Sequence, residues 1–100
     1  MSQQILLLKK GDLKTGFLSK KTAGEFHFYE DKIVFTPIGL SRLFNSAPII
    51  IEASSMIRYS LGFTVIGYSI KLETRTNNFN LNFLGDKIEV LNMMNLYINN

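Results

Sequence analysis

The sequence predicts a mainly β fold, an antiparallel meander or barrel, that is closed by one C-terminal α-helix. Two patterns carry this prediction. Apolar and polar residues alternate with period two in several segments, and the period becomes helical after Gly85. The chain has 100 residues, which is the size of one domain, and its 46% hydrophobic content suffices for a core. We therefore expect residues 1–100 to form a single domain.

The N-terminal part combines a short apolar run with a basic segment. Ile5–Leu8 is continuously apolar, and it predicts either a strand buried on both faces or part of a short helix. Five lysines and one acid, Asp12, follow between Lys9 and Lys21. This segment is either a solvated lysine-rich edge or loop, or a patch that attracts phosphate-bearing partners or an anionic membrane.

Residues 24–36 predict a β-hairpin. Phe26 and Phe28 share one face of the first strand, and the other face carries Glu25, His27 and Tyr29. Glu30-Asp31 forms the turn, because aspartate side chains bond the local backbone. Ile33 and Phe35 repeat the alternation, and Pro37 ends the second strand because proline cannot donate to a ladder.

Four further strands are predicted after a loop over residues 37–48. Ile49–Ile51 is short, and residues 52–55 interrupt it. The others place on their core faces Ile57, Tyr59, Leu61 and Phe63; Tyr68, Ile70 and Leu72; and Phe79, Leu81 and Phe83. The opposite face of the last strand carries Asn78, Asn80 and Asn82, which either accept another strand at a sheet edge or meet solvent.

The helix is predicted to begin at Gly85-Asp86. Asp86 is a favourable N-cap, and Glu89 follows three residues later as in a capping box. An apolar stripe at helical spacing is formed by Val90, Leu91, Met94, Tyr97 and Ile98. This stripe must be buried against the apolar face of the sheet or the open end of a barrel.

These segments resemble a known family. Gly24–Pro37 is similar to the hairpin of GRAM-type and bacterial pleckstrin-homology-like (PH-like) domains, and Ile49–Ile57 is similar to their next strand and turn. Tyr68–Leu72 and Phe79–Phe83 resemble the later strand pair, and Asp86–Ile98 resembles the closing helix, so that the likeness spans roughly residues 20 to 98. It implies a PH-like antiparallel barrel capped by the helix, used as a binding module for membrane lipids, peptides or proteins.

One departure from this family limits the expected ligand. Phosphoinositide-binding members carry a basic Lys…Lys/Arg-x-Arg signature on their first hairpin, whereas here Lys20 and Lys21 are followed by Thr22, Ala23 and Gly24, with no arginine. Phosphoinositide recognition is therefore not carried over.

The sequence contains little that predicts catalysis. It has no cysteine, which excludes disulfides, thiolate metal sites and a cysteine nucleophile, and it has one histidine, His27. His27 shares a face with Glu25 and Tyr29, but no nucleophile motif accompanies it, so we interpret the three as a solvated strand face. We expect no enzyme activity, no cofactor and no metal.

Nucleic-acid binding and a membrane-spanning segment are not expected either. The aromatic residues share faces with Ile and Leu rather than alternating with basic residues on an exposed surface, as single-strand binders require. No apolar run approaches the roughly 18 residues of a membrane span, and the first residues lack the pattern of a signal peptide. A cytoplasmic location, at most peripheral to the membrane, is the expectation.

We expect a binding or targeting module that contacts a protein or peptide partner or an anionic lipid surface. The alternative is a small structural subunit that oligomerises through a sheet edge or the C-terminal helix. The loop over residues 38–44 offers apolar side chains to a membrane or a partner groove, unless they fold back over the barrel. The candidate binding surface consists of Lys9, Lys10, Lys14, Lys20, Lys21, Arg42, Leu43 and Phe44.

Overall fold

A computed structural model describes residues 4–15, 21–39 and 47–98. These residues form seven strands: β1 (Leu7–Thr15), β2 (Thr22–Phe28), β3 (Lys32–Pro37), β4 (Ile49–Glu52), β5 (Met56–Phe63), β6 (Gly67–Thr74) and β7 (Asn78–Leu84). A short 3₁₀ turn, η1 (Ala53–Ser55), joins β4 to β5, and the helix α2 (Ile88–Ile98) follows β7. The predicted fold class, mainly antiparallel β with a C-terminal helix, is confirmed.

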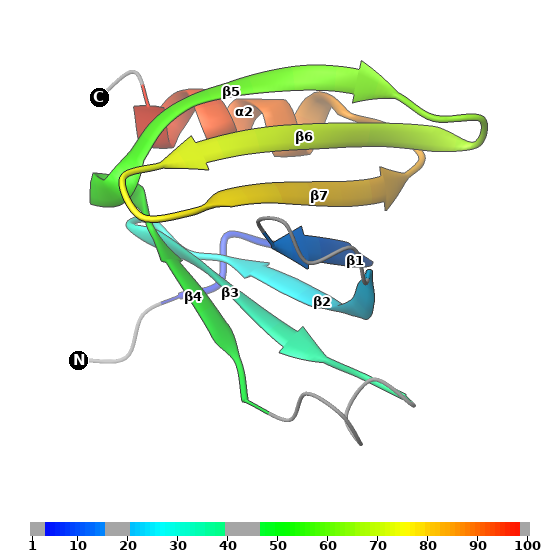
Figure 1. Cartoon of the computed structure of the whole chain (residues 1–100), viewed down its shortest axis with the longest axis horizontal. Helices are drawn as coiled ribbons and strands as arrows, with labels where there is room; N and C mark the ends of the chain where they lie inside the picture. The colour runs from blue at the N-terminus through cyan, green and yellow to red at the C-terminus, as the bar shows by residue number, and fades with distance from the viewer. Residues whose placement is uncertain (1–3, 16–20, 40–46, 99–100) are drawn as a thin grey trace.

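The strands form one curled antiparallel sheet in the order β4-β3-β2-β1-β7-β6-β5. The first strand therefore lies in the middle of the sheet, between β2 and β7. Figure 1 shows β5, β6 and β7 running across one half, with α2 behind them, while β2, β3 and β4 run at an angle below. The sheet thus wraps around one interior, which α2 covers from the side of β5 and β6.

The curl is centred on β1 at Gly11. Residues 7–13 pair with β2, whereas residues 11–15 pair with β7, so that β1 passes from one half of the sheet to the other. Gly11 is paired with both Gly24 and Phe83. A Cβ at Gly11 would lie 2.2 Å from the carbonyl oxygen of Asn82, so the close approach of the two strands requires glycine at this position.

The core is built by the predicted alternation. Phe26, Phe28 and Phe35 are fully buried, as are Ile70 and Leu81 on the other half of the sheet. The ring of Phe26 lies 4.7 Å from that of Phe35 and 4.9 Å from that of Phe83, measured between centroids, so that aromatic contacts join the two halves across the interior.

The helix begins and packs largely as predicted. Gly85 adopts φ +84°, which turns the chain out of β7, and the amide of Ile88 donates to Asp86 Oδ1 at 2.9 Å, so Asp86 is the N-cap. The side chains buried from α2 are Val90, Met93, Met94 and Tyr97. The Tyr97 hydroxyl lies 2.6 Å from the Tyr29 carbonyl oxygen and 3.1 Å from that of Lys32, which ties the end of the helix to the β2–β3 turn.

Two predictions about the central and edge strands were wrong. The part of the lysine-rich segment from Lys9 to Thr15 is neither an edge strand nor a loop, because it belongs to β1, which occupies the centre of the sheet. Ile5–Leu8 is not buried on both faces either, since Leu6 and Leu8 are exposed. The strand choice was correct only from Leu7 onward, where the alternation of β1 begins.

Ile57 and Phe63 were also assigned to the wrong environment. The register of β5 against β6 shifts between Met56 and Arg58, which leaves Ile57 exposed while Tyr59 and Leu61 pack against the core. Phe63, at the end of β5, is 73% exposed. The asparagine face of β7 is not at a sheet edge, because β7 is paired with β1 and β6.

Candidate functional site

Of the residues of the predicted binding surface, the structure describes Lys9, Lys10, Lys14 and Lys21, and these four do not all lie on one face. Lys9 and Lys10 point to opposite faces of β1: the Lys9 ammonium pairs with Glu89 of α2, with Nζ 3.1 Å from Oε1, whereas Lys10 is exposed on the outer face. Lys14 is also on the outer face, and Lys21 is exposed just before β2. Lys20, Arg42, Leu43 and Phe44 lie outside the described residues.

A cluster of exposed apolar side chains surrounds the turn between β5 and β6, which extends beyond the rest of the sheet (Figure 1). We call it the apolar tip and define it as Phe63, Val65, Ile66 and Leu84, which are 73%, 101%, 75% and 64% exposed. Leu84 belongs to the tip because it is paired with Gly67, directly after the turn. Four bulky apolar side chains in water at one end of a small domain are typical of an interaction surface.

The turn that carries the tip is held by its own hydrogen bonds. The amide of Thr64 donates to the carbonyl oxygen of Gly67 at 3.0 Å, and the amide of Gly67 donates to Thr64 Oγ1 at 2.9 Å. Val65 and Ile66 occupy the two positions between these residues, where hairpins usually place Asn, Asp or Gly. The turn geometry therefore presents two aliphatic side chains outward instead of polar ones.

Lysines lie on both sides of the apolar tip. Val65, Ile66 and Leu84 line a groove of about 580 Å³ together with Lys10 and Lys21, and Asp12 is the one acid of this lining. On the helix side, Lys87 Nζ lies 5.7 Å from the centroid of the Phe63 ring. We call Lys10, Lys21 and Lys87 the basic rim.

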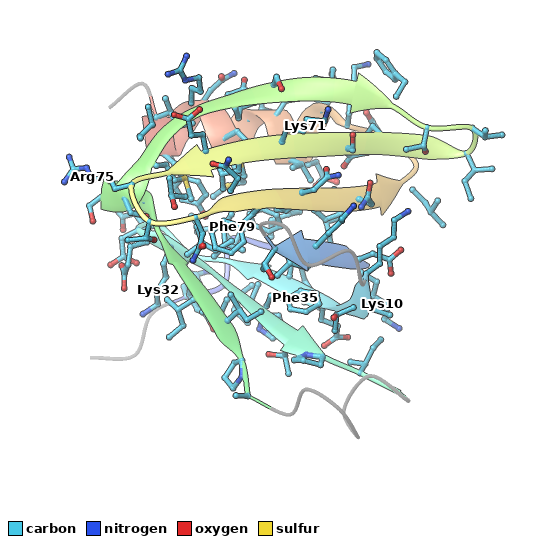
Figure 2. The ribbon with its side chains drawn as sticks, in the orientation of Figure 1. Lys10, Lys32, Phe35, Lys71, Arg75 and Phe79 are labelled. Carbon is cyan, nitrogen blue, oxygen red and sulfur yellow. The ribbon has the colours of Figure 1, made fainter. Side chains whose placement is uncertain are left out.

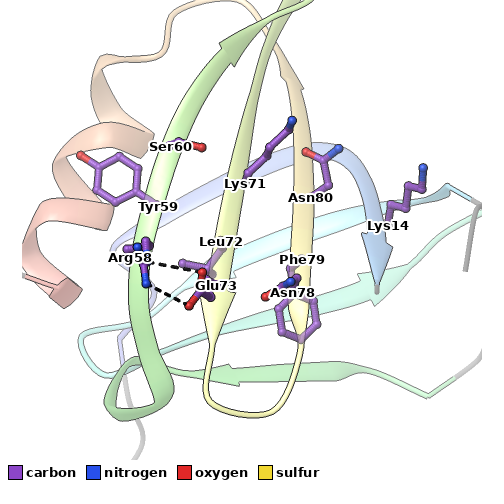
Figure 3. A pocket seen from close by; sticks show the side chains of 10 residues that line it. All are labelled: Lys14, Arg58, Tyr59, Ser60, Lys71, Leu72, Glu73, Asn78, Phe79 and Asn80. Atoms are coloured by element: carbon purple, nitrogen blue, oxygen red, sulfur yellow. Dashed lines mark hydrogen bonds and ion pairs between the residues drawn. The ribbon is translucent and has the colours of Figure 1, made fainter. Parts of the chain in front are cut away.

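A second hollow, of about 450 Å³, lies on the outer face of β5, β6, β7 and β1 (Figure 3). Its centre is a row of cross-strand partners in which Ser60 is opposite Lys71, Lys71 is opposite Asn80, and Asn80 is opposite Lys14. Beside this row, Arg58 and Glu73 form an ion pair, with Nε 3.4 Å from Oε1. The hollow and the apolar tip share no residue.

The catalytic candidate His27 lies on the outer face of β2, between Leu8 of β1 and Val34 of β3. Its Nε2 atom is 3.6 Å from Glu25 Oε1, so the predicted neighbourhood of these two side chains is correct. Among the described residues, no group of three or more His, Asp or Glu side chains is placed to hold a metal ion. No described helix has the length and apolar character needed to cross a bilayer.

Two buried tyrosines have strongly perturbed hydroxyl groups. Burial raises the pKa of Tyr68 to about 12, with smaller contributions from the negative charges of Asp86 and Glu89. Burial also raises the pKa of Tyr97 well above its usual value, with a smaller contribution from Asp31. Both hydroxyls bond to backbone carbonyls, Tyr68 to that of Asp86 at 3.2 Å, so these residues are structural.

The apolar tip is the surface that sequence reasoning missed. The sequence predicts strands over residues 57–63 and 68–72, and it makes no prediction for the side chains of the turn between them. The available signal was the Val65-Ile66 pair between two predicted strands. Aliphatic side chains cannot form the hydrogen bonds to the local backbone that favour polar residues in tight turns.

No protein-family model matches the chain, and no curated protein sequence matches it. Its structure is similar to the crystal structure of the C-terminal domain of an unknown protein from Leishmania infantum. The two share 15% sequence identity with a TM-score of 0.71 over 95% of this chain and 84% of the other. At this identity the likeness concerns the fold alone: a mainly antiparallel β domain with one C-terminal helix.

Proposed function

We propose that this chain is a non-catalytic binding module of PH-like type that attaches to an anionic membrane surface through the apolar tip and the basic rim. The observation that carries the proposal is the protruding hairpin with Val65 and Ile66 at its end and lysines on both sides. The element order, antiparallel strands followed by one closing helix, supports the PH-like part, because it is the order that the resemblance implies.

The arrangement suits a lipid surface for two physical reasons. Moving an exposed apolar side chain from water into the acyl region of a bilayer lowers the free energy. Each side chain that is buried there contributes about 1.5–3 kcal/mol to binding. A lysine close to an anionic leaflet contributes about 1 kcal/mol. Lysines on both sides of the tip would rest among the headgroups while Val65 and Ile66 enter the layer below, and an anionic cytoplasmic leaflet would supply the complementary charge.

Co-sedimentation with vesicles tests the proposal. The intact chain is expected to bind anionic vesicles at low salt, to bind them less at physiological salt, and to bind neutral vesicles weakly. The double variant Lys10→Gln/Lys87→Gln should lose about 2 kcal/mol of binding at low salt, roughly 30-fold, because two rim charges are removed. The loss should shrink as salt shortens the screening length.

The control removes equal charge from the opposite end of the molecule. Figure 2 places Lys32 and Arg75 far from Lys10 and from the end of the β5–β6 hairpin. Lys32→Gln/Arg75→Gln should bind within a few-fold of the parent chain. Equal losses in the two double variants, or no binding of the parent chain to anionic vesicles, would exclude this mode of attachment.

A second candidate function, assembly into an oligomer, is favoured by one observation. β5 is an eight-residue strand at the end of the sheet order, and no described strand pairs with its outer edge, which offers backbone groups to another strand. Light scattering separates the two proposals: a mass that stays oligomeric on dilution supports assembly, and a monomer at all concentrations excludes it.

A further inference from the structure

The hollow on the outer face of β1, β7, β6 and β5 has the features of a binding site for a small anion. Lys14, Asn80 and Lys71 stand on three adjacent strands in direct cross-strand register. Side chains in such a row point to the same face at spacings of about 4.8 Å, so that the two lysines lie on either side of Asn80. Figure 3 shows Lys71 and Lys14 extending away from the sheet on the two sides of the Asn80 amide.

The charge in this hollow is uncompensated. Glu73 is the one acid of the lining, and it is engaged by Arg58, whose guanidinium also places a terminal nitrogen 3.4 Å from Glu73 Oε2. Within the described ranges, neither Lys14 nor Lys71 forms an ion pair. Two lysines two strands apart repel each other, and an anion held between them would convert that repulsion into attraction.

Asn80 adds a requirement for a hydrogen-bond donor. Its amide oxygen is buried and has no hydrogen-bond partner among the described residues. A buried acceptor without a partner destabilises the fold, and a ligand hydroxyl that reaches this oxygen, once the side chains over it move aside, would supply the missing donor. The hollow therefore combines two cationic donors for charged oxygens with one acceptor for a hydroxyl.

We infer that this hollow binds a phosphate ester that carries a free hydroxyl close to the phosphate, as in glycerol 3-phosphate or a glycerol headgroup. Lys14 and Lys71 bind the phosphate oxygens, the Asn80 amide oxygen accepts a hydrogen bond from the hydroxyl, and Ser60 borders the row beyond Lys71. This inference concerns a surface that has no residue in common with the apolar tip, and it does not depend on membrane attachment.

Heteronuclear NMR titration of the intact chain in solution, without membranes, tests the site. Glycerol 3-phosphate should give saturable shifts at the amides of residues 14, 71 and 80, inorganic phosphate should bind there more weakly, and glycerol should not bind. Lys71→Gln should weaken the binding of glycerol 3-phosphate at least tenfold. Lys32→Gln, which removes the same charge from β3, should leave this binding unchanged. Equal weakening by the two variants would mean a general charge effect and would overturn the site.

The variant Asn80→Ala isolates the hydroxyl contact. This variant should lower the affinity for glycerol 3-phosphate to that for inorganic phosphate, while the affinity for inorganic phosphate itself stays unchanged. An unchanged melting temperature would confirm that the variant is folded. A variant that keeps the full preference for glycerol 3-phosphate would refute the role of Asn80. Shifts scattered over all lysines, or none at residues 14, 71 and 80, would refute the site itself.

Vesicles of phosphatidylglycerol distinguish the source of the ligand. If Lys71→Gln weakens attachment to these vesicles while the apolar tip is intact, the headgroup is the ligand; if attachment is unchanged and glycerol 3-phosphate binding is lost, the ligand is soluble. Either result supports the site, given the shifts in solution. Because the titration contains no membrane, failure of the apolar tip to bind vesicles leaves this inference standing, and the reverse also holds.

Discussion

Replacing the two residues at the end of the apolar tip, Val65→Ser with Ile66→Ser, should abolish most of the membrane affinity without altering the fold. Both side chains are largely in water in the free protein, at 101% and 75% exposure. Their removal therefore takes little from the core, and the free energy of unfolding should change by less than about 0.5 kcal/mol. The effect is expected on attachment alone.

The size of the effect follows from these exposures. A fully buried Val or Ile side chain contributes about 1.5–3 kcal/mol, and partial entry into the boundary between headgroups and acyl chains realises roughly two thirds of it. For the two side chains together this gives a loss of about 2–4 kcal/mol. Since about 1.4 kcal/mol is a factor of ten, the partition coefficient should fall roughly 30- to 1,000-fold.

The assay is sedimentation with anionic vesicles at physiological salt, where the contribution of the basic rim is small and the apolar contribution dominates. The matched control is Ile50→Ser, which removes an aliphatic side chain that is 56% exposed on β4, at the other end of the sheet order. A double variant that binds within threefold of the parent chain, or a control that loses as much, would refute insertion of the hairpin.

The remaining predictions concern stability and are measured by urea or thermal unfolding. Gly11→Ala places a Cβ 2.2 Å from the Asn82 carbonyl oxygen and should cost about 3 kcal/mol, whereas Gly62→Ala, whose nearest contact is Ser69 Oγ at 3.0 Å, should cost less than half of that. Tyr97→Phe removes the hydroxyl that bonds the carbonyl oxygens of Tyr29 and Lys32 and should cost about 1–2 kcal/mol; a change no larger than that of Tyr59→Phe would contradict this anchor. Because burial raises the pKa of Tyr68 from 10.0 to about 12, the unfolded chain loses this proton first. The contribution of Tyr68 to stability should therefore be complete below about pH 10 and be lost as the pH rises toward 12, so that stability falls less steeply over this range in Tyr68→Phe.

The parts of the fold that could be predicted are those whose signal is local. The hairpin around Glu30-Asp31 and the strands carrying Ile70 and Leu81 alternate cleanly, and Asp86 caps the helix as its residue type indicates. Each of these depends on neighbours within a few residues. Glu89, expected to complete a capping box, instead places a carboxylate oxygen 3.1 Å from Lys9 of β1, a partner that only the folded chain brings near.

The errors arose where distant pairing decides the outcome. The segment after Lys9 is polar enough to suggest a loop, yet it is a central strand because β2 and β7 both pair with it. The irregularity after Met56, which exposes Ile57, has no marker in the sequence. The candidate site was predicted only in its lysines: alternation along β1 sends Lys10 toward the groove beside the apolar tip, whereas Lys14 joins Lys71 across β7, a neighbour that no spacing along the chain reveals.

The central place of β1 also governs the order in which the chain can fold. Its partners over residues 11–15 are residues 79–83, so during synthesis the ladder between them can form only after the strands from β2 to β6 have been made. Until then one edge of β1 is unpaired, open to strands of other chains, and pairings of such long range form slowly. During that wait Lys10 and Lys14, on the outer face of the same strand, repel other copies of the chain. We therefore expect the lysines of β1 to oppose aggregation of the growing polypeptide.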